Sequence, residues 1–153
     1  MYLEAKNYNS LMGAPSWPAQ HFTPRELRCR KTDAVRVWIP TLMKLDRLRA
    51  RLGERITVIS GYRSPEHNAE VSESGSLNGP HTWGRAFDIL PYSRERSIAA
   101  AMQIAKEEGF TRCGLLLSKE RLILHLDDLG AAEGFADRRD GQLFCWTYRH
   151  DPD

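Results

Sequence analysis

The chain has 153 residues and a formal net charge of +2, with basic and acidic residues almost in balance. One domain of this length can bury its own core without disulfides or a structural metal, so a metal site here need not be required for folding. The balanced charge predicts no nucleic-acid module, and no apolar run is long enough to insert into a membrane.

The cysteines and the first ten residues of the chain indicate the cellular compartment in which the protein is made. Cys29, Cys113 and Cys145 are too widely spaced for a CxxC motif and too few for a paired framework, so we expect reduced, structural thiols. Residues 1–10 contain no apolar signal segment, which predicts synthesis in the cytoplasm without an export signal. The densest basic run, residues 25–31, is more typical of a solvated helix end than of an anion-binding patch.

The first part of the chain divides into a lead-in and the start of a domain. Residues 1–20 are rich in Asn, Ser, Gly and Pro and predict an extended lead-in, followed by one domain over residues 21–150. Thr23 then precedes Pro24 and Glu26, an N-cap, a proline at the first helical position and an acid in the first turn. This pattern predicts a short helix.

Hydrophobic periodicity predicts the remaining elements. A helix is expected from Pro40 to Leu52, where leucines recur at three- and four-residue steps and Gly53 follows. The β-branched run 56–60 predicts a strand, and the polar segment 71–80 predicts a surface loop. Later patterns predict a strand at 85–90, a helix at 94–108, a hairpin of strands 112–116 and 121–127, and a last strand near 142–148.

This order of elements indicates an α+β domain with a mainly antiparallel sheet and helices packed on one side. Side chains alternate along a strand, so His125 and Asp127 should share one face of the predicted strand 121–127. His81 precedes the strand that contains Asp88, and Gly84 permits a tight bend between them. Two histidines and an aspartate could therefore hold one metal ion and leave a fourth position open.

Three blocks of sequence, in this order, resemble a known family. They are Ser60-Gly61-Tyr62-Arg63-Ser64-Pro65 with His67 and Asn68, then His81-x-x-Gly84-Arg85-Ala86-x-Asp88, then Ile123-x-His125-x-Asp127. The blocks are similar to those of the M15-type zinc peptidases, a group of D-Ala-D-Ala carboxypeptidases and peptidoglycan endopeptidases with the hedgehog/DD-peptidase fold. The resemblance extends from the Phe22–Leu27 segment to about residue 128.

The resemblance implies one zinc ion bound by His81, Asp88 and His125, with water in the fourth position. It also implies that Arg63 reaches the site, where a guanidinium can hold a substrate carboxylate or carbonyl oxygen. Zinc would lower the pKa of its water and polarise the scissile carbonyl, so no protein nucleophile is needed. Further candidates for contact with substrate are Tyr62, His67, Asn68 and Trp83. The two aromatic residues could equally well serve packing, whereas His67 and Asn68 are more typical of turn or pocket-wall groups that order the loop.

The general base is harder to assign from sequence. Many relatives carry an acidic residue a few positions before the last histidine, where this chain has residues 121–123, Arg-Leu-Ile. Asp127 is the first candidate, either as base or as the partner that orients His125, and Glu120 is the second. Relatives also usually have serine two positions before the first histidine, and this chain has Gly79.

From the resemblance we expect a zinc-dependent peptidase that hydrolyses peptide bonds in bacterial cell-wall peptidoglycan, as an endopeptidase or a D,D-carboxypeptidase. Its expected partners are peptidoglycan stem peptides, without nucleic acid or membrane insertion. The favoured setting is a phage-type endolysin or a virion-associated lysis protein in a phage-like particle, monomeric if free. Without an export signal, it would reach the wall or periplasm after release from the cell or as part of a virion.

Two alternatives belong to other classes of function. A non-catalytic zinc-binding module of the same fold would explain the missing upstream acid and the change at Gly79. An Fe(II) oxygenase would use His125, Asp127 and His150 as a 2-His-1-carboxylate triad and leave His81 without a role.

Overall fold

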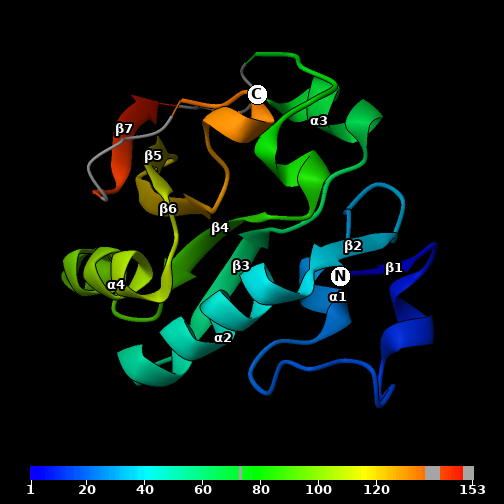
Figure 1. The fold of residues 1–153 in the computed structure, drawn as a ribbon. Coiled ribbons are helices and arrows are strands. Elements are labelled where there is room, and N and C mark those ends of the chain that lie inside the picture. Colours follow the sequence, from blue (N-terminus) through cyan, green and yellow to red (C-terminus); the bar gives the residue numbers. More distant parts are fainter. Residues whose placement is uncertain (73, 137–141, 150–153) are drawn as a thin grey trace.

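The computed structural model describes residues 1–72, 74–136 and 142–149 (Figure 1). Within these residues, five strands form one sheet in the order β3-β4-β6-β5-β7. Neighbouring strands are antiparallel except β5 and β7, which run parallel. The sheet is therefore mainly antiparallel, as expected, and its strands in chain order are β3 Ile56–Ser60, β4 Ala86–Pro91, β5 Arg112–Ser118, β6 Arg121–Asp127 and β7 Phe144–Arg149.

Two long helices cover one face of this sheet, α2 (Ile39–Leu52) and α4 (Glu95–Glu108) (Figure 1). Both end at a glycine in the left-handed conformation, as the sequence predicted. Leu45 of α2 and Ala101 of α4 are fully buried and belong to the same core cluster as Leu124 of β6. Burial of a leucine contributes roughly 2 kcal/mol, so this layer of helices supplies much of the stability. The prediction of an α+β fold is confirmed, and both long helices lie on one side of the sheet.

Shorter elements complete the described structure. The short helix predicted after Thr23 is present, and the backbone N–H of Thr23 donates to the Glu26 carboxylate at 2.7 Å. The sequence analysis missed the pair β1–β2, the helix α3 and the three short 3-10 helices. The predicted short helix is α1 Pro24–Leu27, and the elements not predicted are β1 Tyr2–Ala5, η1 Tyr8–Leu11, β2 Val35–Trp38, α3 Pro65–Val71, η2 Pro80–Trp83 and η3 Ala131–Glu133.

The lead-in, residues 1–20, packs on the domain. Its strand β1 pairs antiparallel with β2, and Leu11 is buried in the core cluster. Asp46 of α2 accepts hydrogen bonds from the backbone N–H groups of Gln20 and His21, which fixes the path of the chain into α1. The lead-in thus contains regular structure that its composition did not predict, and the domain boundary at residue 20 stays a prediction.

The register between β4 and β6 sets the position of the predicted metal ligands. Asp88 lies directly opposite His125, and Ala86 lies opposite Asp127. Directly opposed residues of an antiparallel pair point to the same face of the sheet. Asp88, His125 and Asp127 therefore share the face that is turned away from α2 and α4, while Phe87 and its neighbours in the register fill the core. This alternation is the one predicted from the sequence.

Gly84 joins η2 to β4 at a place where no side chain fits. Its φ is +64°, and a Cβ built there would lie 2.4 Å from the backbone oxygen of Arg36. We expect Gly84→Ala to lower the free energy of unfolding by at least about 2 kcal/mol, because both the left-handed backbone and the contact are unfavourable. Urea unfolding measures this change.

The matched control is Gly53→Ala, since Gly53 has a φ of +74° but no heavy atom within 4 Å of the added Cβ. Only the backbone cost of about 1 kcal/mol is expected there. Equal losses for the two variants would show that the contact with Arg36 contributes nothing.

Cys113 of β5 and Cys145 of β7 are in register, and their sulfur atoms are 2.7 Å apart. Both are free thiols in this structure, Cys113 buried and Cys145 exposed. Burial, with the contact to Cys145, raises the pKa of the Cys113 thiol. We expect Cys145 to react first with an oxidised low-molecular-weight thiol, after which the Cys113 sulfur displaces that thiol and closes a disulfide.

The expected change is the loss of two hydrogen atoms in the intact mass, with peptides of β5 and β7 linked in a non-reducing digest. Cys145→Ser should instead leave Cys113 unmodified under the same treatment, because the buried thiol is out of reach of the oxidant. A persistent mixed disulfide at Cys145 in the native protein would contradict the predicted closure.

Candidate metal centre

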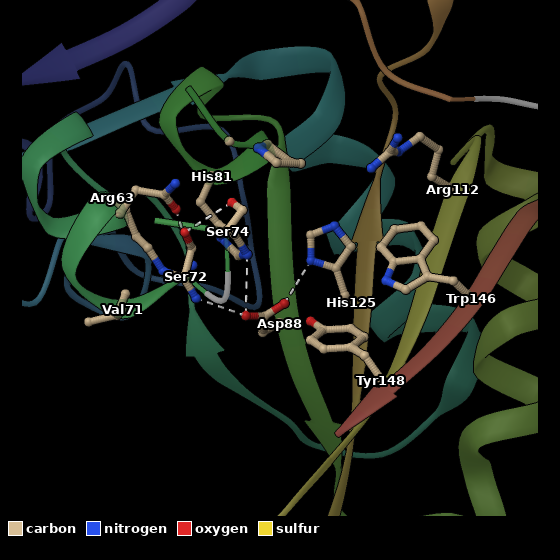
Figure 2. Close-up of a pocket in the computed structure, with 13 residues that line it drawn as sticks. Arg63, Val71, Ser72, Ser74, His81, Asp88, Arg112, His125, Trp146 and Tyr148 are labelled. Atoms are coloured by element: carbon tan, nitrogen blue, oxygen red, sulfur yellow. Dashed lines mark hydrogen bonds and ion pairs between the residues drawn. The ribbon is translucent and has the colours of Figure 1, made fainter. Parts of the chain in front are cut away.

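A cavity of about 480 Å³ opens on the face of the sheet that α2 and α4 leave uncovered. Figure 2 shows His81 and Arg63 on one side of Asp88, and His125 with the β7 residues Trp146 and Tyr148 on the other. The described residues that line the cavity are Arg63, Asn68, Val71, Ser72, Ser74, Gly79, Pro80, His81, Asp88, Arg112, His125, Trp146 and Tyr148.

His81 is held by the backbone on the side away from the cavity. It lies in η2, is 3% exposed, and its Nδ1–H donates to the carbonyl oxygen of Gly61 at 2.7 Å. A carbonyl oxygen can only accept, so Nδ1 carries the proton and Nε2 keeps its lone pair when the ring is neutral. This Nε2 is directed at Asp88, 3.2 Å from Oδ2.

His125 meets a carboxylate at each ring nitrogen. Its Nδ1 is 2.8 Å from Asp88 Oδ1, and its Nε2 is 2.8 Å from Asp127 Oδ2. One ligand atom from each of His81, Asp88 and His125 lies within 4.8 Å of the other two. Two nitrogens and one oxygen at this spacing suit a single zinc ion, for which bonds of about 2.0–2.2 Å are typical. The residues present therefore fit the implied metal, with His81 Nε2 and His125 Nδ1 as the nitrogen ligands.

Asp127 lies behind His125 rather than in the cavity. Its carboxylate is fully buried and accepts hydrogen bonds from His125, from Arg112 Nε and from the backbone N–H of Leu129. A carboxylate that holds the second nitrogen of a metal-binding histidine fixes the tautomer and the orientation of the ring. This position suits the orienting role predicted for Asp127, and the geometry gives no support to its role as a base.

Arg63 borders the cavity with its guanidinium held in place by three acceptors. Nε donates to Ser60 Oγ at 2.9 Å, Nη1 to Asn68 Oδ1 at 3.2 Å and Nη2 to Asp88 Oδ2 at 3.1 Å. Ser60 lies opposite Asp88 in the β3–β4 register, so the sheet itself sets the position of the arginine. A positive charge is thus fixed beside the three potential ligands, as the sequence predicted.

The sequence signature of the family described as Peptidase M15 matches residues 20–127, and this range contains all three potential ligands. The chain belongs to the M15 peptidase family. No curated protein matches the chain individually. M15 peptidases are typically zinc-dependent, which agrees with a His-Asp-His group that could bind a metal.

The geometry of this M15 family member accounts for the glycine two positions before His81. A Cβ at Gly79 would lie 2.6 Å from Asn68 Nδ2. Asn68 is 1% exposed, accepts from Arg63, and donates from Nδ2 to the Ser76 carbonyl at 2.7 Å. The amide of Asn68 therefore fills the space that a serine side chain at position 79 would need. Asn68 also lines the cavity, in agreement with its predicted place near substrate.

Three of the residues predicted to contact substrate do not line the M15 cavity. Trp83 faces another way, with its Nε1–H donated to Asn78 and its ring 6.4 Å from that of Phe135. Tyr62 borders a different hollow beside β1 and β2, and His67 lies in α3 with Nδ1 4.0 Å from Glu70. Residues next to a ligand or to Arg63 in the sequence can point away from the site, because the side chains of successive residues project in different directions.

The other two predicted residues fall outside the M15 site or outside the described chain. Glu120 is exposed at the β5–β6 turn, where its φ is +64°, and it does not line the cavity. His150, required by the oxygenase alternative, lies outside the described residues. That alternative also needs Asp127 as a ligand, whereas its carboxylate is directed at His125 Nε2, Arg112 and a backbone N–H.

The sequence analysis missed the wall that β7 and Arg112 provide. The Trp146 ring centroid is 5.4 Å from that of His125, and the Arg112 guanidinium lies 4.9 Å from the centre of the Trp146 ring. Gly114 makes this contact possible, since a Cβ there would lie 2.7 Å from Trp146. The alternation of large aromatic residues at 144, 146 and 148 was visible in the sequence, but the face that it covers depends on the pairing with β5.

Protonation of the three potential ligands is set by burial and by their neighbours. Burial alone would raise the pKa of Asp88, yet His81 and His125 lower it well below the usual value. Burial and the charge of Arg63 lower the pKa of His81. Burial disfavours the imidazolium of His125, but hydrogen bonds to Asp127 and Asp88 outweigh this effect and raise its pKa to about 9. Near neutral pH, His125 is therefore the potential ligand that must lose a proton before it can bind the metal.

We expect zinc binding to the metal-free protein to release one proton at neutral pH. A proton on His125 competes with the metal at every pH below its pKa, so zinc affinity should rise about tenfold per pH unit from neutral pH to 9 and then level off. Zinc titration calorimetry in two buffers with different ionisation enthalpies counts the protons. Binding without proton release near pH 7 would contradict the protonation of His125.

None of the helices among the described residues is both long and apolar enough to cross a lipid bilayer.

Proposed function

We propose that this M15 family member is a zinc-dependent peptidase that hydrolyses peptide bonds in bacterial cell-wall peptidoglycan, as an endopeptidase or a D,D-carboxypeptidase. One observation supports this above the others: His81, Asp88 and His125 converge at the edge of an open cavity with Arg63 beside them. A site with three protein ligands leaves a coordination position for water, which structural zinc sites do not.

Each residue of the candidate site would have a separate role in this reaction. His81, Asp88 and His125 would hold zinc, which supplies an activated water and polarises the scissile carbonyl when it is bound. Arg63 would fix a carboxylate or carbonyl oxygen of the stem peptide in the cavity. Trp146 and Tyr148 would pack against the peptide and shield it from water. Asp127 would hold the His125 ring at the required angle.

Digestion of purified peptidoglycan, followed by mass spectrometry of the muropeptides, tests the proposal. New amino termini are expected from an endopeptidase, and free D-alanine from a D,D-carboxypeptidase. A chelator should abolish both, and added zinc should restore them. Intact muropeptides after incubation of the zinc-loaded protein would refute the proposal.

A non-catalytic zinc-binding module remains a second candidate because of one observation. Among the described residues that line the cavity, Asp88 is the only carboxylate, and it is already a potential ligand. No described acid is left there to accept a proton from water. Zinc bound with high affinity, together with undigested peptidoglycan, is the result expected of such a module.

The biological setting is a further part of the proposal. We infer a phage-type endolysin or virion-associated lysis protein that acts as a monomer on the wall or periplasm. Loss of turbidity when the protein is added to permeabilised cells would support this setting. Sedimentation of the free protein as a stable dimer would count against the monomer.

A further inference from the structure

A second cavity, of about 680 Å³, lies along the outer strand of the sheet. β3 is the first strand in the sheet order, so one of its edges has no neighbouring strand among the described residues. Residues of β3 line the cavity together with residues of α1, of the segment that follows α1, and of α2. It shares no residue with the lining of the candidate metal centre.

Five arginines line this cavity, against a single carboxylate, that of Glu26. The whole chain carries a net charge of only +2, so the positive charge is concentrated here. The Glu26 carboxylate accepts from the backbone N–H and the hydroxyl of Thr23, as part of the N-cap of α1. The arginines of this groove, hereafter the arginine groove, are Arg25, Arg28, Arg30, Arg49 and Arg55.

Most of these guanidinium groups lack an acidic partner. Arg28 pairs with Asp33 at 2.9 Å. The other four have no carboxylate within 4.0 Å among the residues that the structure describes. Two arginines elsewhere are neutralised, since Arg85 and Arg112 each pair with a buried aspartate. Unpaired charge gathered in one concave surface attracts anions.

The backbone holds part of the arginine groove in place before any anion arrives. Arg28 donates from Nη1 to the carbonyl of Arg25 at 2.7 Å, and Arg30 donates from Nη2 to the carbonyl of Val58 on the open edge of β3 at 3.2 Å. Burial is the main cause that lowers the pKa of Arg30, and repulsion by the neighbouring Arg28 guanidinium adds to it. A bound anion would relieve this repulsion. Because the backbone already holds two of the arginine side chains, their immobilisation on binding would cost less conformational entropy.

We propose that the arginine groove binds an anionic cell-wall polymer that carries repeated phosphodiester groups. Guanidinium groups bind phosphate in a bidentate manner, and five of them exceed what one isolated phosphate can contact. The proposal rests on the proposed function, because a peptidase that acts on peptidoglycan meets polymers attached to the same wall. Binding there would keep the metal centre close to its substrate.

The lining favours a polymer without bases over nucleic acid. Single-stranded nucleic acids are held by aromatic rings on which successive bases stack. Among the described residues that line the arginine groove, Tyr92 and His21 are the only ones with an aromatic ring, and the Arg55 guanidinium covers the Tyr92 ring at 5.3 Å. A row of stacking surfaces is therefore missing from the described lining.

Co-sedimentation of the full-length protein with purified walls tests the proposal. The probe is wall that retains its phosphodiester polymer, compared with the same wall after the polymer has been removed with hydrofluoric acid. We expect at least about tenfold weaker binding to the stripped wall, and binding that weakens steeply with salt. Equal binding to both walls would overturn the proposal.

A double substitution separates the arginine groove from general surface charge. Arg25 and Arg55 are exposed, and Arg25→Gln with Arg55→Gln should weaken binding to intact wall about tenfold or more. The matched control is Arg96→Gln with Arg121→Gln, two exposed arginines outside the groove whose loss changes the net charge equally. Equal losses in the two double variants would overturn the assignment to this groove, as would tighter binding of single-stranded DNA than of intact wall.

Failure of this inference can be told apart from failure of the proposed function. The R25Q/R55Q variant should still cleave a soluble muropeptide that lacks the polymer, with an unchanged unfolding midpoint as the check on folding. Conversely, zinc-free protein should still bind intact wall. Polymer binding without any peptide cleavage would refute the proposed peptidase function and leave the groove assignment in place. Cleavage without polymer binding would refute the groove assignment and leave the peptidase function in place.

Discussion

Replacement of His125 by alanine is expected to remove the metal and to lower peptide hydrolysis by at least about a thousandfold. His125 is one of three potential ligands, and two ligands rarely retain zinc at a site of this kind. Loss of the ion removes several kilocalories per mole of charge stabilisation from the reaction, which corresponds to a rate factor of this order. Metal content after dialysis and the rate on muropeptides are the two measurements.

The control for this prediction is His21→Ala. His21 is exposed and contacts Asp46 of α2, far from the three ligands in the sequence and outside the lining of the metal cavity. Metal content and rate should both be unchanged there. If His125→Ala keeps stoichiometric zinc while His81→Ala loses it, the assignment of His125 as a ligand is wrong.

The second large effect is expected from Asp127→Asn. An asparagine can still accept a hydrogen bond from His125 Nε2. The substitution nevertheless removes a buried negative charge that faces both the His125 ring and the buried Arg112. Loss of a carboxylate behind a metal-binding histidine typically lowers metal affinity about 10- to 100-fold. Competition with a chromophoric chelator measures this affinity.

This variant also separates the two roles predicted for Asp127. If Asp127 only orients His125, hydrolysis by Asp127→Asn should recover substantially when zinc is saturating. If Asp127 is the general base, zinc affinity should change little and hydrolysis should stay low at any zinc concentration. Asp128→Asn is the matched control: Asp128 is also buried and paired, but its partners are Thr41, Lys44 and Arg85. It should lose stability without loss of zinc affinity.

Local patterns were sufficient to predict the elements that carry the metal ligands. The helical spacing of the leucines predicted α2, and β-branched or alternating residues predicted β3, β4 and β6. Alternation along β6 placed His125 and Asp127 on one face, and the β4–β6 register then brought Asp88 to the same face. These inferences held because strand periodicity alone decides which side chains share a face.

Long-range pairing explains most of what the sequence analysis missed. Val35 and Val37 alternate with polar or half-buried neighbours in β2, but such a short strand is recognisable only once its partner β1 is known. Ser64 and Pro65 carry an N-cap signal for α3, and the Ser64 hydroxyl accepts from the N–H of His67. The place of Trp146 beside His125 required the parallel pairing of β7 with β5, which no local pattern contains.

The strand β7 contributes cavity-lining residues that lie outside the matched family range. The family signature ends at residue 127, so it includes all three potential ligands and excludes Trp146 and Tyr148, which form the opposite wall. Substitutions in β7 can thus reshape one side of the cavity and leave every ligand unchanged. Under the proposed function, β7 would be an exchangeable specificity element, and we expect variation of Trp146 and Tyr148 to change which stem peptide is preferred.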